Sequence, residues 1–279
     1  MIAPGNAFST STISLLLSSY PIIREADGIL VPGGFGVRGV EGMVSAAKYA
    51  REQRIPYLGV CLGMQIMVIE YARNVLGIKG AQSTEFFEST QHPVIIFMPE
   101  INQRIMGGTM RLGARDTLIS YRIHSGERSL ASEVYGTCED QEAISERHRH
   151  RYEVNPEKVS ALSAAGLCFT GKDEKGERME IIELPRVVHP FYFGAQFHPE
   201  MKSRPNRPSP PFFAFVAMAS KSSKELGKAG KMWRDYEDEM LRVSVINSPS
   251  GRLKRALSGV SANGELDLLD IKARRTGSM

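Results

Sequence analysis

The sequence predicts an α/β fold with an open, mostly parallel sheet that is flanked by helices. The apolar run Gly28–Val31 ends in the glycine-rich turn Pro32–Gly36, and helical periodicity follows from Val40 to Glu52. A second apolar run, Pro56–Val60, precedes a second helical pattern from Leu62 to Val75. Because strands and helices alternate, right-handed crossovers should make neighbouring strands parallel.

Further elements are expected along the middle and the end of the chain. The sequence predicts strands over Val94–Met98, Gly108–Leu112, Glu146–Val154 and Tyr192–Phe197. Leu167–Phe169 and Met179–Ile182 should form a hairpin across the polar turn Gly171–Arg178. After a proline-rich loop, Phe212–Ala219 is predicted to be an apolar helix.

The pattern divides the chain into three parts. Residues 1–24 are serine-rich and lack clear periodicity. Residues 25–220 carry the predicted strands and helices and form the main domain. Residues 221–279 should begin with a charged helix, Lys231–Arg242, and continue as a disordered tail rich in Ser, Gly, Lys and Arg.

Composition and charge exclude several classes of protein. The chain has 279 residues, of which 42% are hydrophobic and 24% charged, as is usual for a globular protein. Its formal net charge is +4, but twelve of the Lys and Arg residues and eight of the Asp and Glu residues lie beyond Ser220. The first 220 residues therefore carry 23 charges of each sign. This neutral body argues against a nucleic-acid-binding protein.

Membrane and secreted proteins are also disfavoured. No run of 18 apolar residues occurs, so no membrane span is predicted. The apolar segment Ile13–Ile23 is interrupted by Ser18, Ser19 and Pro21 and has no basic residue before it, unlike a secretory signal. Three cysteines are too few for a disulfide scaffold and indicate a reducing compartment, so we expect a cytoplasmic protein.

Cys61 is the candidate nucleophile. It lies in Gly59–Gln65, where a buried strand turns into a helix, and such a turn points its side chain out of the sheet. Side chains at the flanking glycines would collide with the neighbouring strand and helix. The helix N-terminus favours a thiolate there. A free cysteine is more often a small buried hydrophobe, but the G-x-C-x-G-x-Q frame favours the nucleophile.

His198 and Glu200 are the candidate partners of Cys61. Pro199 between them favours an extended geometry that projects both side chains to the same side, so Glu200 could orient the imidazole. Backbone N–H groups of Leu62 and Gly34 could stabilise an oxyanion. The alternatives are that His198 is a packed histidine, that Glu200 is a solvated glutamate, and that Pro32–Gly36 is an ordinary glycine turn. A phosphate-binding loop is disfavoured, because neither common glycine pattern occurs.

These residues resemble the catalytic triad of class I glutamine amidotransferases, in the same chain order. The resemblance runs from about residue 25 to residue 220. Four further stretches in it are similar to the glutaminase domain of CTP synthases: Gly28–Gly36, Ser83–Phe86, Gly108–Gly113 and Glu146–Glu153. The resemblance implies that Cys61 attacks the glutamine side-chain amide, that His198 shuttles protons, and that water hydrolyses the resulting thioester. It also implies glutamine contacts at Gly34, Leu62, Gly63, Met64, Gln65, Glu85 and Arg151.

The Glu85 and Arg151 assignments are chemically reasonable. A carboxylate can pair with the α-ammonium of glutamine, and a guanidinium can grip its α-carboxylate through two hydrogen bonds. The alternative for the run around Arg151 is a solvated strand, with Arg147, Arg149 and Arg151 on one face and two histidines on the other. A metal site at His148 and His150 is disfavoured because no further ligand cluster completes it, so we expect no metal.

The resemblance also implies partners that this chain does not contain. In the family, an amino-terminal synthase (amidoligase) domain binds ATP, UTP and magnesium and uses the ammonia to make CTP. Nothing in this chain resembles that domain, so we expect no CTP synthesis by the chain alone and no cofactor of its own. GTP is the expected activator, L-glutamine the substrate, and an oligomer with intact subunits the expected assembly.

One part of the family pattern is missing. The family's domain opens with an apolar strand and a helix before the segment that matches Gly28, whereas the 27 residues here do not match. The sheet is then expected to lack an inner or edge strand, which would uncover Ile29–Val31 and the apolar side of the Leu62–Val75 helix.

Two functional hypotheses therefore stay open. One is the ammonia-producing half of a CTP synthase, and the other is a truncated, non-catalytic remnant that acts in the assembly or regulation of intact subunits. A different cysteine hydrolase is disfavoured, since Glu85, Arg111 and Arg151 all lie in motifs of one family.

Overall fold

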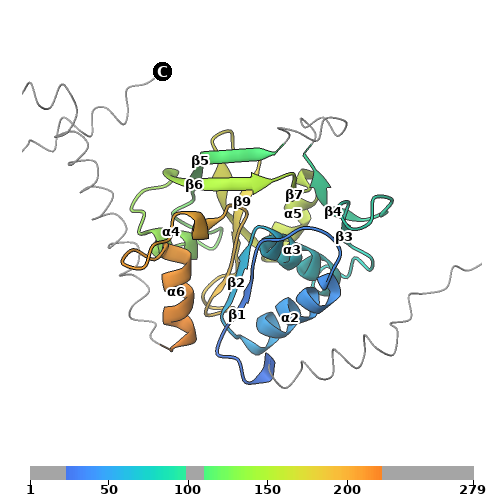
Figure 1. Ribbon diagram of the computed structural model, residues 1–279, viewed down its shortest axis with the longest axis horizontal. Coiled ribbons are helices and arrows are strands. Elements are labelled where there is room, and N and C mark those ends of the chain that lie inside the picture. Colours follow the sequence, from blue (N-terminus) through green and yellow to red (C-terminus); the bar gives the residue numbers. More distant parts are fainter. Residues whose placement is uncertain (1–22, 99–109, 222–279) are drawn as a thin grey trace, which may run out of the picture. The chain divides into compact units, whose positions relative to one another are not determined.

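Two sheets form the framework of the computed structural model, which describes residues 23–98 and 110–221 (Figure 1). The larger sheet contains, in spatial order, β1 (Ile29–Val31), β2 (Tyr57–Val60), β10 (Tyr192–Ala195), β9 (Met179–Glu183), β8 (Cys168–Asp173), β5 (Arg111–Ile119) and β6 (Glu142–His150). The smaller sheet contains β3 (Gln82–Ser83), β4 (Pro93–Phe97) and β7 (Tyr152–Val154). The helices are α2 (Val40–Gln53), α3 (Leu62–Asn74), α4 (Leu130–Tyr135), α5 (Pro156–Ala164), α6 (Pro210–Ala219) and the 3-10 turn η1 (Pro199–Met201).

The larger sheet is mixed rather than mostly parallel. β1, β2 and β10 are parallel, as the alternating pattern predicts. From β10 onward, the strands β9, β8, β5 and β6 pair in antiparallel fashion. The reason is partly local, because the tight turn between β8 and β9 can only produce antiparallel neighbours. The predicted α/β class and the predicted hairpin are therefore confirmed, and the expected strand direction is corrected.

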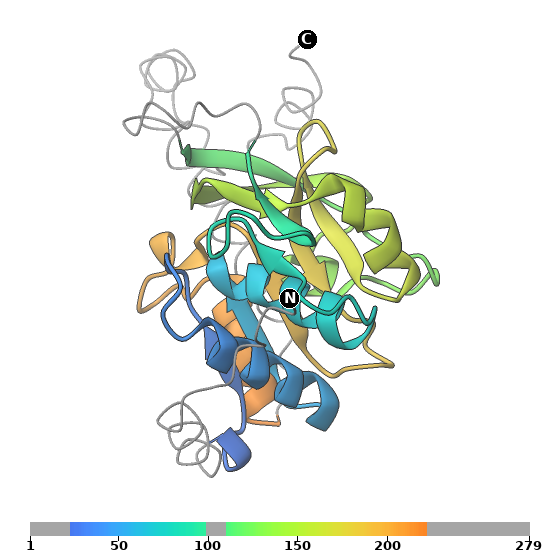
Figure 2. The ribbon, with the colours of Figure 1, turned by 90° about the vertical axis from the view of Figure 1, so that its right-hand side faces the viewer.

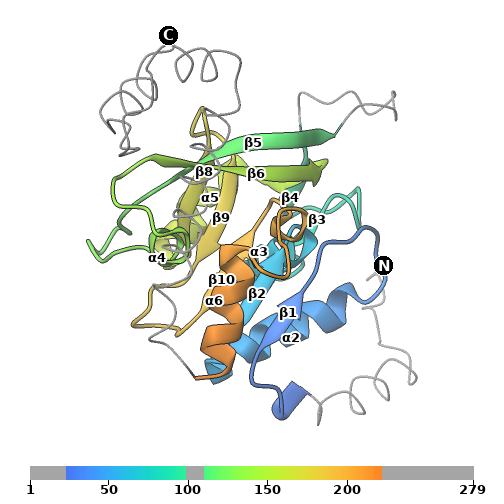
Figure 3. The same cartoon turned by 60° about the vertical axis from the view of Figure 1, so that its left-hand side comes forward.

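Helices cover both faces of the parallel part of the sheet (Figure 3). Tyr57 and Tyr192 pack with α2, α3 and Leu162 of α5 on one face. Leu58 and Phe193, one residue further along the same strands, pack with α4 and α6 on the other face. Because successive strand residues point to opposite faces, an apolar run without alternation is what a strand buried on both sides requires.

Several predicted elements appear within a residue or two of their expected bounds, but others differ. β5 continues to Ile119 instead of ending at Leu112, and β8 continues to Asp173, into the expected turn. The expected strand Glu146–Val154 is two strands, β6 and β7, which belong to different sheets and are separated by Arg151. The helices α4 and α5 were not predicted. Residues 108 and 109, most of the segment Ile13–Ile23 and the tail from residue 222 lie outside the described residues.

The helix α3 is fully covered, so the expectation that it loses its cover is wrong. Every residue from Leu62 to Ala72 is buried. The helix packs against β2 and β10, and also against α2 and β4 of the smaller sheet; Figure 2 shows it among these elements. β1 pairs with β2 at one edge of the described sheet, and there Leu30 is 40% exposed while Val31 is buried. No helix within the described ranges is long and apolar enough to cross a membrane.

The turn from β2 into α3 is packed too closely for any residue larger than glycine. A β-carbon on Gly59 would lie 2.6 Å from the carbonyl carbon and oxygen of Gly63. One on Gly63 would overlap the carbonyl oxygen of Val31 in β1. The collisions expected from the sequence are therefore present, and they fix the start of α3 against the ends of β1 and β2.

We predict that Gly63→Ala destabilises the protein by about 1–3 kcal/mol or more, because an added methyl group must displace a backbone atom of β1. Gly42→Ala is the control, since a β-carbon on Gly42 in α2 meets nothing within 4 Å. This second change should stabilise the protein by roughly 0.5–1 kcal/mol, because alanine favours a helix interior. Urea unfolding measures both, and equal stability of the two variants would refute the close approach.

Candidate active site

Cys61 sits on a strained turn between β2 and α3. Its backbone has φ 50° and ψ −100°, values that L residues rarely adopt and that cost of order 1–3 kcal/mol. The N–H of Cys61 donates to the carbonyl of Ala195 in β10 at 2.7 Å, and its own carbonyl accepts from Gln65 N at 3.2 Å. β10 and the first turn of α3 thus hold the residue in this strained conformation.

His198 follows β10 and lies beside Cys61. Its N–H donates to the carbonyl of Arg147 in β6 at 2.8 Å, and its Nδ1 lies 2.6 Å from Glu200 Oε1. A β-carbon on Gly33 would be 2.7 Å from Cε1 of His198 and 3.5 Å from Cβ of Cys61. Gly33 therefore lies against both residues, and the absence of a side chain there lets the imidazole and the thiol approach.

The electrostatics of His198 favour its protonated form. Burial works to lower the pKa of His198, but interactions with Cys61 and Glu200 outweigh burial and raise the pKa to about 10. Nε2 of His198 makes no hydrogen bond to an atom of the described residues. The part of the rise in the His198 pKa that comes from Cys61 is therefore due to the closeness of the sulfur. At neutral pH His198 is an imidazolium beside the sulfur, an arrangement that supports a thiolate.

The glycine-rich turn after β1 meets the first residue of α3. A β-carbon on Gly34 would lie 3.1 Å from Cδ2 of Leu62. As the first residue of α3, Leu62 has an N–H without an intrahelical acceptor. The two predicted oxyanion donors therefore belong to adjacent segments beside Cys61.

Glu85 and Arg151 come together near the same turn. Glu85 Oε1 accepts from Gly36 N at 2.9 Å. Burial raises the pKa of Glu85, whereas the Gly36 hydrogen bond and the charge of Arg151 oppose that rise. Burial also raises the pKa of Tyr152, and the charges of Glu85 and Arg151 act on it in opposite directions. An acidic and a basic side chain thus lie within electrostatic reach of each other beside the turn that follows β1.

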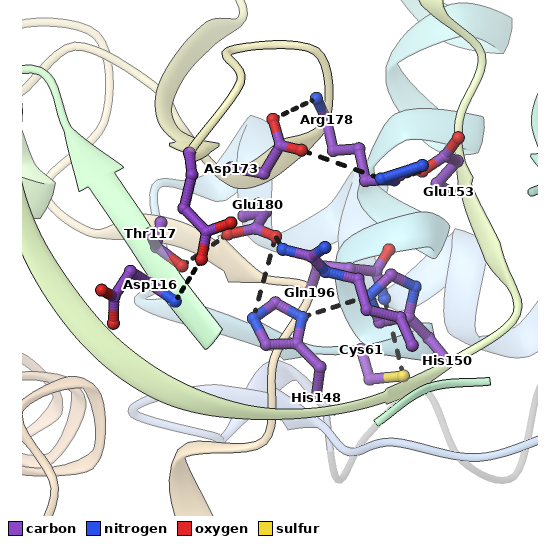
Figure 4. A network of polar contacts seen from close by, with 12 residues as sticks. Cys61, Asp116, Thr117, His148, His150, Glu153, Asp173, Arg178, Glu180 and Gln196 are labelled. Carbon is purple, nitrogen blue, oxygen red and sulfur yellow. Dashed lines mark hydrogen bonds and ion pairs between the residues drawn. The ribbon is translucent and has the colours of Figure 1, made fainter. Parts of the chain in front are cut away.

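Two other predicted contact residues direct their side chains inward. Met64 is fully buried in the core. Gln65 is 3% exposed, and its Nε2 donates to the carbonyl of Tyr152 and to Oε1 of Gln196, each at 3.2 Å. Gln196 in turn donates from Nε2 to Sγ of Cys61 at 3.6 Å, as Figure 4 shows. The sequence reasoning missed Gln196, although its position two residues before His198 places it on the same side of the strand.

A buried polar network lies behind the site, between β5, β6 and β9 (Figure 4). Nδ1 of His148 lies 3.2 Å from Nε2 of His150. Glu180 accepts from Arg111 at 2.7 Å and from Thr117 at 2.5 Å. Burial lowers the pKa of His148 to about 2 and of His150 to about 3, and it raises the pKa of Glu180 to about 7. Both histidines are therefore neutral at physiological pH.

The alternation predicted for this strand is present. His148 and His150 are buried, whereas Arg147 and Arg149 are exposed. Within residues 23–98 and 110–221, no group of three or more His, Cys, Asp or Glu side chains is placed to hold a metal ion.

The sequence matches a known family over most of its length. The family described as Glutamine amidotransferase class-I matches residues 10–218. A CTP synthase from Methanothrix thermoacetophila is 56% identical over 185 residues, which are 66% of this chain and 31% of that protein. CTP synthase 1-B from Xenopus laevis is 56% identical over 181 residues, 65% of this chain and 29% of that protein. The chain thus spans less than a third of the length of these relatives.

A solved structure agrees with the sequence matches. The glutaminase domain of Trypanosoma brucei CTPS, with bound acivicin, superposes with a TM-score of 0.66 at 38% identity. The match covers 76% of each chain. Family, relatives and structure all point to the same domain. The chain belongs to the class I glutamine amidotransferases and corresponds to the glutaminase domain of CTP synthases.

Proposed function

We propose that the chain hydrolyses L-glutamine through Cys61, His198 and Glu200. The observation that supports this most strongly is the strained Cys61 turn facing a histidine whose pKa is raised to about 10 by the sulfur and by Glu200. A sulfur nucleophile and a cation beside it that can donate a proton are the two groups that amide cleavage by a thiol requires.

The first half of the reaction forms a thioester. The Cys61 sulfur attacks the side-chain carbonyl carbon of glutamine, and the resulting oxyanion accepts hydrogen bonds from the N–H groups of Leu62 and Gly34. His198 gives its Nε2 proton to the leaving nitrogen, the C–N bond breaks, and ammonia departs. Glu200 holds the ring by its Nδ1–H during this transfer.

The second half restores the enzyme. The neutral His198 takes a proton from water as the water oxygen attacks the thioester carbon. The second tetrahedral intermediate expels the sulfur, which leaves as thiolate beside the newly formed imidazolium, and the product is glutamate. Because the nucleophile and the proton carrier are both side chains, this hydrolysis uses no cofactor.

Glu85 and Arg151 would recognise the amino-acid end of the substrate. The α-ammonium would pair with the carboxylate of Glu85, and the α-carboxylate would pair with the guanidinium of Arg151. The α-ammonium would also offset the burial that raises the pKa of Glu85. The two charges lie by the turn that leads from β1 to the candidate oxyanion donor Gly34. One glutamine molecule would then contact the charged pair at one end and Cys61 at the other.

The ammonia is proposed to serve a synthase domain in pyrimidine nucleotide biosynthesis. The relatives are named CTP synthases, so we propose a partner domain that converts UTP to CTP with ATP and magnesium, with GTP as activator. The chain alone would make no CTP, and the ligase activity belongs to the combination. Three free cysteines suit a cytoplasmic location. The alternative of a non-catalytic remnant predicts no glutamine hydrolysis despite an intact fold.

A glutamine-mimicking electrophile should label Cys61 and spare the other two thiols. Burial raises the pKa of the Cys168 thiol to about 11, and Cys138 is exposed in the connection between α4 and β6, outside the site. Peptide mass spectrometry measures the labelling and glutamate release measures turnover, with Cys61→Ser as the control that should lose both. Equal labelling of all three cysteines would contradict a specifically activated Cys61.

His198→Ala should abolish turnover, whereas Glu200→Gln should reduce it less, because orientation contributes less than proton transfer. Removing the Glu200 charge also removes one cause of the raised pKa of His198, so that pKa should fall from about 10 toward 6.5. Steady-state kinetics and an NMR titration of His198 measure the two effects. Near-normal turnover in His198→Ala would rule out the proposed triad.

Arg151→Lys should raise KM for glutamine at least several-fold with a smaller change in kcat, because lysine cannot make the paired contact with a carboxylate. Arg149→Lys is the matched control, since Arg149 is exposed on β6 two residues away. The control should leave both constants near their original values. Similar kinetics for the two variants would remove Arg151 from substrate recognition.

A further inference from the structure

A chain of three buried side chains ends on the sulfur of Cys61. Cys61, Gln65 and Gln196 are each no more than 3% exposed. Gln65 Nε2 donates to Gln196 Oε1 at 3.2 Å. Gln196 Nε2 donates to Cys61 Sγ at 3.6 Å (Figure 4). The proposed triad does not use this chain, and the reaction steps derived above leave both amides without a role.

The direction of the two hydrogen bonds is fixed by a backbone carbonyl. Gln65 Nε2 lies 3.2 Å from the carbonyl oxygen of Tyr152, which can only accept a hydrogen bond. The amide nitrogen of Gln65, not its oxygen, must therefore face Tyr152. The second hydrogen of the same nitrogen then goes to the amide oxygen of Gln196. Gln196 is left with its nitrogen toward the sulfur, so an N–H donor rather than a carbonyl oxygen meets Cys61.

An N–H donor aimed at sulfur favours the charged form of the thiol. Hydrogen bonds to an ionised acceptor are stronger than those to its neutral form, so a donor shifts the balance toward thiolate. The bond weakens when the sulfur forms the C–S bond of the thioester, because the sulfur then loses its charge. It strengthens again when water has added and the sulfur leaves with the electron pair of that bond.

We propose that Gln196 is a further catalytic residue, whose amide N–H stabilises the Cys61 thiolate, and that Gln65 is a positioning residue that fixes the orientation of this amide. The consequence for turnover rests on the proposed glutamine hydrolysis. The effect on the sulfur itself exists without any substrate and can be measured by itself.

Besides Cys61, Glu180 on β9 also changes charge in the relevant pH range, since burial raises the pKa of its carboxyl group to about 7. Its backbone carbonyl accepts from Gln196 N at 2.8 Å. His198 at the end of β10 and Glu200 in η1 form the ion pair already described. His148 and His150 on β6 are neutral, since burial lowers the pKa of these side chains to about 2 and about 3. The pH dependence of Cys61 reactivity between about pH 5 and pH 10 therefore reports on Cys61 with His198 and Glu180, and the contribution of Gln196 is the difference between its variants and wild type, in which those two groups are unchanged.

The test is the rate of Cys61 alkylation by iodoacetamide as a function of pH, in the full chain and without glutamine. Peptide-resolved mass spectrometry separates Cys61 from the exposed Cys138. Gln196→Met keeps the length of the side chain but removes the donor, so the midpoint of the profile should move upward by about one pH unit. Gln65→Met should move it in the same direction by less, because the Gln196 amide remains but is no longer fixed.

Two further variants separate the donor from mere packing. Gln196→Glu keeps the shape and brings a carboxyl group that repels the thiolate when ionised, so its upward shift should exceed that of Gln196→Met. Asn155→Leu is the matched control. Asn155 lies at the start of α5, and its buried side-chain amide donates to the carbonyl of Pro93 in β4. This control should lower the melting temperature and leave the alkylation profile unchanged.

The outcomes distinguish this proposal from the proposed function. Profiles of the Gln196 and Gln65 variants that coincide with wild type and Asn155→Leu would overturn it, whatever their melting temperatures. If Gln196→Met does not fold, the Gln196→Glu and Gln65→Met profiles decide the question in the same way. If the midpoints of the alkylation profiles shift upward but the wild-type chain does not hydrolyse glutamine, the role of Gln196 is supported and only the proposed hydrolysis is refuted.

Discussion

The site depends on the close approach between the first turn of α3 and the carboxyl ends of β1 and β2. Gly63 packs against the carbonyl of Val31, and Gly59 packs against Gly63, with no space for a β-carbon at either position. This packing prevents the turn from relaxing, so Cys61 keeps a φ of 50° and the energetic cost that goes with it. Backbone contacts thus hold the strained residue, and its side chain is available for chemistry.

The parallel pairing of β2 and β10 brings the other groups to that turn. Both strands end at the same edge, where the N–H of Cys61 donates to Ala195, the last residue of β10. Gln196 and His198 follow Ala195. They are two residues apart, so in an extended chain both side chains lie on the same side, which is the side of Cys61. One provides an amide donor and the other an imidazole. A single strand therefore carries both groups that act on the sulfur, and its register with β2 determines where they lie.

Local signals were enough to predict the turn at Cys61, the helices α2 and α3 and the β8–β9 hairpin, because each depends on neighbours in sequence. Strand direction in the rest of the sheet could not be predicted, since an apolar run does not encode its partner. The break at Arg151 was missed because polar and apolar residue types continue to alternate through Tyr152, Glu153 and Val154, although Glu153 and Val154 are both buried in β7. Gln196 was missed because its contact with Cys61 joins residues 135 positions apart. The expected exposure of α3 was wrong because α2 and the predicted strand Val94–Met98 pack on this helix, and a strand pattern does not show which helix the strand will cover.

The break at Arg151 lies beside a pair of buried histidines at the junction of the two sheets. The carbonyl of Tyr152 accepts from Gln65 Nε2 at 3.2 Å and lies 3.0 Å from His150 Nδ1, so this nitrogen must carry a hydrogen. With Nδ1 as donor, a neutral His150 can accept from Nδ1 of His148 through its remaining nitrogen. A protonated His150 could keep this contact only by donating from Nε2 to Nδ1 of His148, which would then have to carry its own hydrogen on Nε2. Burial lowers the pKa of His148 to about 2 and of His150 to about 3, so both rings are neutral at this junction between the two sheets. The same junction fixes Gln65 and places Arg151, so the sulfur and the charged pair that would bind glutamine share one support.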